Sequence, residues 1–159
     1  MGPTKIQGLP AHVLLVHLVL AAVPIAALVL LAAALWPAAG RRLGVITPVI
    51  ALGALLTVPV TTHAGQWLQA RVISTPLIRK HVALGKGVLP WMIGLFVIAL
   101  LVWLWERTDS AALHGNLGRI VVGVLAVAIS VGAVQQVVRT GEAGSRALWT
   151  HNFTSQPAK

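Results

Sequence analysis

The sequence contains no cysteine. That absence excludes disulfide bonds, thiolate metal sites, iron–sulfur clusters and a cysteine nucleophile. Acidic residues are almost as scarce, since Glu106, Asp109 and Glu142 are the only three and all lie outside the long apolar runs. The chain therefore has no pair of carboxylates for acid–base catalysis and no acidic proton relay inside those runs.

Motifs for nucleotide binding and for nucleophilic catalysis are also missing. The sequence has neither a glycine-rich phosphate loop nor a nucleophile elbow. Its formal net charge is +9, but the twelve lysines and arginines stand singly or in pairs between apolar blocks and form no basic stripe. They are typical of topology signals and lipid-headgroup contacts. We therefore expect neither an enzyme nor a nucleic-acid-binding protein.

Hydrophobic residues make up 57% of the chain and charged residues only 9%, which is typical of a membrane protein. About 20 apolar residues are needed to cross the hydrocarbon layer, and four segments meet that need: 13–36, 43–62, 88–105 and 120–138. The first is too long for the apolar region of a signal peptide and is expected to be retained. The sequence predicts an all-α integral membrane four-helix bundle of one domain, 1–159, with up-down-up-down topology. Segment 63–87 is then a loop, and 139–159 is a tail.

The distribution of positive charge predicts the orientation. Eight lysines and arginines lie on the face that the two termini share with the loop at 63–87, against four on the other face, so both termini are expected in the cytoplasm. The eight are Lys5, Arg71, Arg79, Lys80, Lys86, Arg139, Arg146 and Lys159, and the four are Arg41, Arg42, Arg107 and Arg119.

Small residues recur at steps of three and four in the second and fourth apolar segments. Such stripes let helix backbones approach closely, because van der Waals contact drives helix association in lipid. The alternative is that apolar helices are rich in alanine in any case. The predicted packing faces are Gly44, Thr47, Ala51 and Ala54 in the second segment, and Gly123, Ala126, Ser130 and Ala133 in the fourth.

Four of the six histidines gather at one membrane face: His12, His17, His63 and His81. Neutral imidazole binds haem iron, zinc and copper, so they are candidate ligands, and the alternative is an interfacial or structural role. Their expected depths match poorly, and His12 and His17 lie roughly 140° apart around a helix, too far to share a ligand. No metal is therefore assigned. His114 and His151 lie in polar segments and are weaker candidates.

The long connection carries a short basic amphipathic segment around Trp67. Such a segment lies in the headgroup plane or docks on a partner, and the alternative is a solvated linker with one tryptophan anchor. The residues predicted to contact a partner or headgroups are Gln66, Trp67, Gln69, Arg71, Arg79, Lys80, Arg139, Arg146 and Trp149.

Four stretches of the chain resemble a bacterial family of small membrane proteins catalogued as domain of unknown function 2231, in the form found in actinobacteria. They are GLPAHVLLVH at 8–17, AGQWLQARV at 64–72, KHVALGKGVLPW at 80–91 and VQQVVRTGEAGSRALW at 134–149. The resemblance implies a multi-pass protein of the bacterial inner (plasma) membrane. It carries no assigned reaction, but some members are fused to Rieske-type ferredoxin domains, which suggests electron transfer.

In that resemblance His12, His17 and His81 match the family's histidines. This chain departs from the family where Gln66 and Gln69 replace acidic residues beside the loop tryptophan, and where Val13 replaces a frequent proline. The absence of acidic residues at these positions would remove metal ligands, or side chains that hydrogen-bond to the ligands. The first functional prediction is therefore a non-catalytic accessory subunit of a larger inner-membrane complex, with other membrane subunits as partners and a lipid transporter as host. The alternative is an electron-transfer subunit that binds haem b or a metal through the histidines of the cytoplasmic face, with a haem held by His17 together with His63 or His81.

Overall fold

A computed structural model describes residues 4–108 and 115–150. His114, His151, Lys159 and the tail from residue 151 onward lie outside these ranges. The described elements are β1 (Lys5–Ile6), β2 (Leu9–Pro10), α1 (Ala11–Leu35), α2 (Pro37–Leu43), α3 (Ile46–Gln69), α4 (Pro76–Lys86), α5 (Val88–Trp105) and α6 (Asn116–Trp149).

Four stretches of helix are long and apolar enough to cross a membrane: Ala11–Leu35, Ile46–Gln69, Pro76–Trp105 and Asn116–Trp149. The prediction of an all-helical protein with four candidate membrane spans is thus confirmed, and the chain is a multi-pass membrane protein. Large apolar side chains such as Leu28, Leu56 and Val124 are more than half exposed on the outside of the bundle. Hydrocarbon, rather than water, is the solvent that suits such a surface.

The segment at 63–87 is mostly helical, where the sequence predicted a loop. Helix α3 continues to Gln69, and α4 begins at Pro76 with Thr75 as its N-cap, whose Oγ1 accepts a hydrogen bond from the Ile78 backbone N–H at 3.2 Å. A proline in the first turn after a threonine cap is a common start of a helix. The hydropathy pattern does not reveal α4, because the helix packs on α6 while its charged side chains Arg79, Lys80 and Lys86 are exposed.

The interior of the bundle consists largely of small side chains, which allow close approach of the helices. Residues of the predicted packing faces are buried here, but Gly44 is not part of a packing face. It lies after the last turn of α2 with φ of +48°, where glycine avoids the strain that a side chain would bring. The buried members of the predicted faces are Thr47, Ala51, Ala54, Gly123, Ala126, Ser130 and Ala133.

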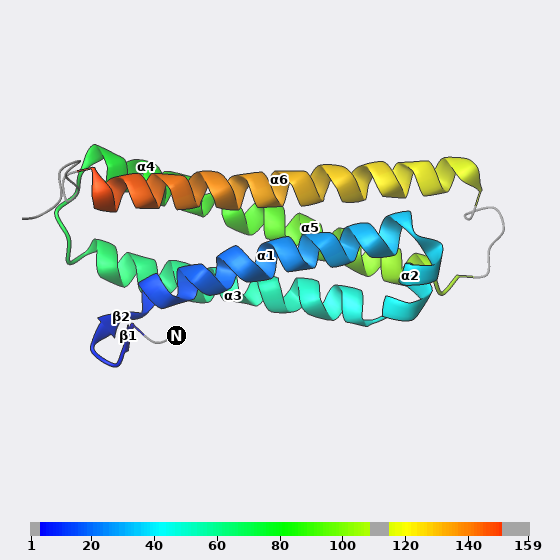
Figure 1. Ribbon diagram of the computed structural model, residues 1–159, viewed down its shortest axis with the longest axis horizontal. Helices are drawn as coiled ribbons and strands as arrows, with labels where there is room; N and C mark the ends of the chain where they lie inside the picture. The colour runs from blue at the N-terminus through cyan, green and yellow to red at the C-terminus, as the bar shows by residue number, and fades with distance from the viewer. Residues whose placement is uncertain (1–3, 109–114, 151–159) are drawn as a thin grey trace, which may run out of the picture.

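The long helices lie side by side, and segments far apart in the sequence meet at one end (Figure 1). The start of α1, the last turns of α3, all of α4 and the last turns of α6 lie at that end, next to the β1–β2 hairpin. Helix α2 lies at the opposite end. Because α1 packs on α3 and α6, and α4 packs on α6, the first end brings together residues from four different helices.

Candidate functional site

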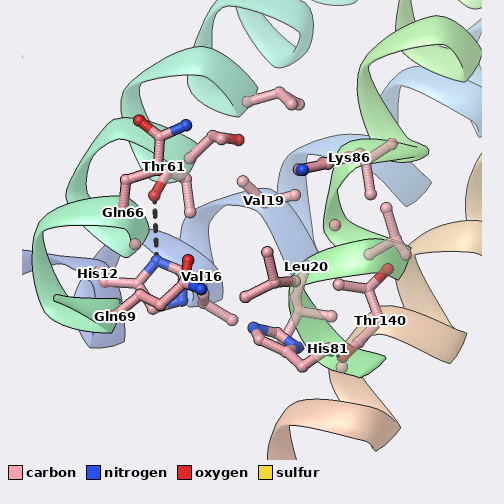
Figure 2. Close-up of a pocket in the computed structure, with 18 residues that line it drawn as sticks. His12, Val16, Val19, Leu20, Thr61, Gln66, Gln69, His81, Lys86 and Thr140 are labelled. Atoms are coloured by element: carbon pink, nitrogen blue, oxygen red, sulfur yellow. Dashed lines mark hydrogen bonds between the residues drawn. The ribbon is translucent and has the colours of Figure 1, made fainter. Parts of the chain in front are cut away.

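A cavity of about 300 Å³ lies at the end of the bundle where α1, α3, α4 and α6 meet (Figure 2). Its wall is mainly apolar, with valines contributed by α1, α3, α4, α5 and α6. The polar side chains that line it include His12, His81, Gln66, Gln69 and Lys86. No carboxylate is among the lining residues in the described part of the chain. The cavity is of the size and character of a small-ligand site.

His12 is held against α3 by one hydrogen bond and one close packing contact. It lies in the first turn of α1, and its Nδ1–H donates to the Thr61 carbonyl oxygen at 3.0 Å (Figure 2). The ring lies directly on the backbone at Gly65, because a Cβ there would come within 2.9 Å of His12 Nδ1 and Cε1. Glycine at position 65 is therefore required for the ring to reach that carbonyl.

His81 is held against α6 in the same way. Its Nδ1–H donates to the Thr140 carbonyl oxygen at 2.9 Å. A Cβ at Gly144 would lie 3.0 Å from His81 Cε1 and 3.1 Å from Nδ1, which is tighter than an ordinary contact. In both cases the histidine contacts a threonine carbonyl and the glycine four residues further along the same helix.

The two imidazole rings face each other across the cavity. Their centroids are 6.1 Å apart, and their planes make an angle of 71°. A carbonyl oxygen can only accept a hydrogen bond, so the proton of each neutral ring is on Nδ1 and the lone pair is on Nε2. Donation from the second ring nitrogen to a backbone carbonyl is the usual arrangement of a metal-ligating histidine. The arrangement presents two neutral nitrogen ligands to one small volume.

The other histidines predicted as ligands do not join this pair. His17 is exposed, and its Nδ1–H donates to the Val13 carbonyl oxygen of its own helix at 2.7 Å. His63 is half-buried but does not line the cavity. Within residues 4–108 and 115–150 no cluster of three or more histidines and acids is placed to hold a metal ion. The structure thus brings together His12 and His81, and not His17 with His63 or His81.

The residues predicted to contact a partner or headgroups divide into three groups. Gln66 and Gln69 lie in the last turns of α3 and line the cavity. Trp67 instead stacks against Arg71, whose guanidinium carbon is 3.9 Å from the ring centroid, and the Lys5 ammonium is 5.5 Å from the same centroid. The remaining side chains are exposed on α4 and α6, namely Arg79, Lys80, Arg139, Arg146 and Trp149.

The two threonines and two glycines that hold the rings were not predicted from the sequence. A signal for them exists, because the pattern Thr-x-x-Ala-Gly occurs twice, at 61–65 and at 140–144. Only the structure shows that each copy carries a histidine from another helix.

Comparison of the chain with protein-family models, with curated proteins and with solved structures finds no match. The resemblance to domain of unknown function 2231 therefore stays a prediction.

Proposed function

We propose that this protein binds one transition-metal centre between the Nε2 atoms of His12 and His81. The observation that carries the proposal is the pair of opposed imidazoles, each with Nδ1–H donating to a backbone carbonyl at 2.9–3.0 Å. This hydrogen bond fixes the tautomer and the ring orientation, and it makes the ligating nitrogen more basic.

The separation of the rings suits a shared metal. A metal bound by imidazole lies about 2.0–2.1 Å from the nitrogen, hence roughly 3.2 Å from the ring centroid, so two rings on opposite sides of one metal have centroids roughly 6.4 Å apart. The observed distance is 6.1 Å.

The same two ligands serve a free ion or the iron of a haem. Imidazole suits copper, iron, nickel and zinc ions, and haem iron also accepts histidine ligands. The cavity of about 300 Å³ accommodates an ion with small additional ligands directly, whereas a haem is larger than this volume. An iron or copper centre at this site would suit electron transfer.

The charge distribution supports an up-down-up-down topology with the metal site and both termini on the cytoplasmic side of a bacterial plasma membrane. Most of the lysines and arginines lie at the end of the bundle that contains the cavity, and an excess of these residues marks the cytoplasmic side. Those at the cavity end within the described ranges are Lys5, Arg71, Arg79, Lys80, Lys86, Arg139 and Arg146.

The test is to purify the protein from membranes in mild detergent and to measure metals by elemental analysis together with the visible spectrum. We expect about one metal per chain, with a Soret band if the metal is haem iron and no Soret band if it is a free ion. His12→Ala and His81→Ala should each lose the metal. His17→Ala and His63→Ala are the matched controls and should keep it.

Loss of metal is interpretable only if the variants fold, so circular dichroism and size-exclusion profiles of each variant are compared with the unmodified protein. A folded His12→Ala that keeps the full metal content would contradict the proposal. So would an unmodified protein that neither contains metal nor takes up added Zn²⁺, Cu⁺ or ferric haem.

An accessory role in a larger complex or lipid transporter stays a prediction, because the structure offers no observation in its favour. The small-residue faces are buried between the helices of the chain itself, apart from Gly44, so docking on another subunit would rest on exposed side chains such as Arg79, Lys80 and Trp149. Co-purification of a stoichiometric partner under mild detergent would support the accessory role.

A further inference from the structure

The buried positions of α5 repeat buried positions of α1 at a constant offset. Each buried residue of α5 follows a buried residue of α1 by 69 positions, and the same offset places His12 on His81. Any two helical stripes can be aligned at some offset, but here it also makes eight of the 25 pairs between 12–36 and 81–105 identical. They are His12/His81, Val13/Val82, Leu15/Leu84, Val19/Val88, Leu20/Leu89, Leu31/Leu100, Leu35/Leu104 and Trp36/Trp105.

Helices α3 and α6 correspond in the same manner at an offset of 79 positions. This offset places five of the seven buried residues of α3 on buried residues of α6, and it places the two Thr-x-x-Ala-Gly patterns on each other. Nine of the 22 pairs between 44–65 and 123–144 are identical. They are Gly44/Gly123, Val45/Val124, Ile50/Ile129, Gly53/Gly132, Ala54/Ala133, Val58/Val137, Thr61/Thr140, Ala64/Ala143 and Gly65/Gly144.

The helix contacts follow the same equivalence. Helix α1 packs on α6 and, correspondingly, α5 packs on α3, while each half also pairs its own two stretches of helix, α1 with α3 and α4–α5 with α6. In Figure 1 both histidine-bearing starts, α1 and α4, lie at the same end of the bundle. The halves are therefore related by an approximate two-fold axis along the helices, as in membrane proteins built from parallel repeats.

We infer that residues 12–65 and 81–144 are two copies of one helical hairpin, and that each copy contributes an equivalent half-site. In each half-site a histidine of the first helix is positioned by the carbonyl of a threonine and the bare backbone of a glycine on the second helix. Thr61, Gly65, Thr140 and Gly144 are thus positioning residues.

Equivalence of the half-sites restricts what they hold together. A ligand between them meets the lone pair of an Nε2 atom on each of two sides. It must therefore accept an electron pair from both nitrogens in the same way, as a single metal atom does. This restriction rests on the proposed metal site, whereas the duplication of the hairpin and of its half-site does not.

The half-sites are tested without metal by nitrogen-15 NMR of histidine-labelled protein in detergent micelles. In the neutral form of each side chain, His12 and His81, we expect the proton on Nδ1. Gly65→Ala should shift the signals of His12 more than those of His81, and Gly144→Ala should do the reverse. Gly141→Ala is the matched control, because its Cβ would meet only Leu20 at an ordinary 3.6 Å.

The two-fold relation is tested by spin labels, for which the natural absence of cysteine is convenient. Leu28 corresponds to Val97 and Leu52 to Val131, and all four are exposed. Electron–electron distance measurement should give the same distance for labels at 28 and 131 as for labels at 97 and 52.

Unequal cross-half distances would overturn the duplication. A proton on Nε2 of either His12 or His81 in its neutral form, or a glycine variant without effect on its own histidine, would overturn the half-sites. If both tests succeed and added Zn²⁺, Cu⁺ and ferric haem all fail to bind, the half-sites stand and the metal proposal alone is wrong.

Discussion

The two halves of the molecule position corresponding histidines, His12 and His81, with different backbone structures. In the first half α1 is one helix of 25 residues that begins at Ala11 and continues through Pro24. In the second half the corresponding stretch is divided at Gly87 into α4 and α5. The half-site geometry is nevertheless the same to within 0.1 Å in the Nδ1–carbonyl distance, 3.0 Å against 2.9 Å.

At the break between α4 and α5 the Leu84 carbonyl oxygen accepts from the Gly87 N–H at 3.0 Å and, in addition, from a side chain of α6. Gln136 of α6 donates through Nε2 to the Leu84 carbonyl oxygen at 2.7 Å. At the corresponding position of the first half, Thr57 donates instead to Ala54 of its own helix at 2.6 Å. The contact between helices at each histidine is thus the same in both halves. The backbone around it differs, and in the second half a side-chain hydrogen bond stabilises the break between the helices.

The largest expected effect is loss of metal affinity on removal of either histidine. His12→Ala and His81→Ala should each weaken binding about 100-fold or more, since removal of a ligand should cost at least as much as loss of a group that only orients one. Equivalence predicts that the two losses agree within a few-fold, as measured by competition titration with a chelator. A much larger loss of affinity for one variant than for the other would contradict the equivalence of the two half-sites.

The next effect concerns the glycines beneath the rings. Gly65→Ala and Gly144→Ala should each displace one ring and lower metal affinity by about 10–100-fold, the range for a group that orients a ligand. Gly53→Ala in α3 is the control for the first and Gly141→Ala in α6 for the second, since a Cβ at 53 meets nothing within 4 Å. Unchanged affinity in both site variants would show that the glycines do not position the histidines.

The halves differ in the space available next to two corresponding glycines, Gly53 and Gly132. A Cβ at Gly132 would clash with the Trp91 ring. In the first half Ala22 occupies the position that corresponds to Trp91. Gly132→Ala should therefore lower the free energy of unfolding by about 1–3 kcal/mol, and Gly53→Ala should leave it unchanged. Unfolding in SDS titrations measures both, and equal stabilities would refute the difference.

The smallest effect is expected at the break between α4 and α5. Gln136→Leu removes the hydrogen bond from α6 to the Leu84 carbonyl oxygen and leaves the one from the Gly87 N–H. It should lower the free energy of unfolding by about 1 kcal/mol, the scale of a hydrogen bond between membrane helices. Its neighbour Gln135 is exposed, so Gln135→Leu is the matched control. If the two variants unfold at the same SDS concentration, Gln136 does not stabilise the break.

The sequence predicted the membrane spans well because an uncharged apolar run of about 20 residues is rarely stable outside hydrocarbon. It did not predict α4, since this amphipathic helix carries charged residues on its exposed surface and contains no apolar run. Without α4 the expected depths of His12 and His81 matched poorly, and the pairing of these two residues was missed. The repeat was missed as well, because its identities are spread over four helices and two offsets, and only the contacts show which residues belong together.

The most direct test of the shared centre is a titration of histidine-labelled protein with Zn²⁺, Cu⁺ or haem, followed by nitrogen-15 NMR. We predict that the Nε2 signals of His12 and His81 change together and that both changes are complete at one equivalent, while those of His17 and His63 stay in place. A change at only one of the two, or completion of each at a different equivalent, would contradict a single centre held by both halves.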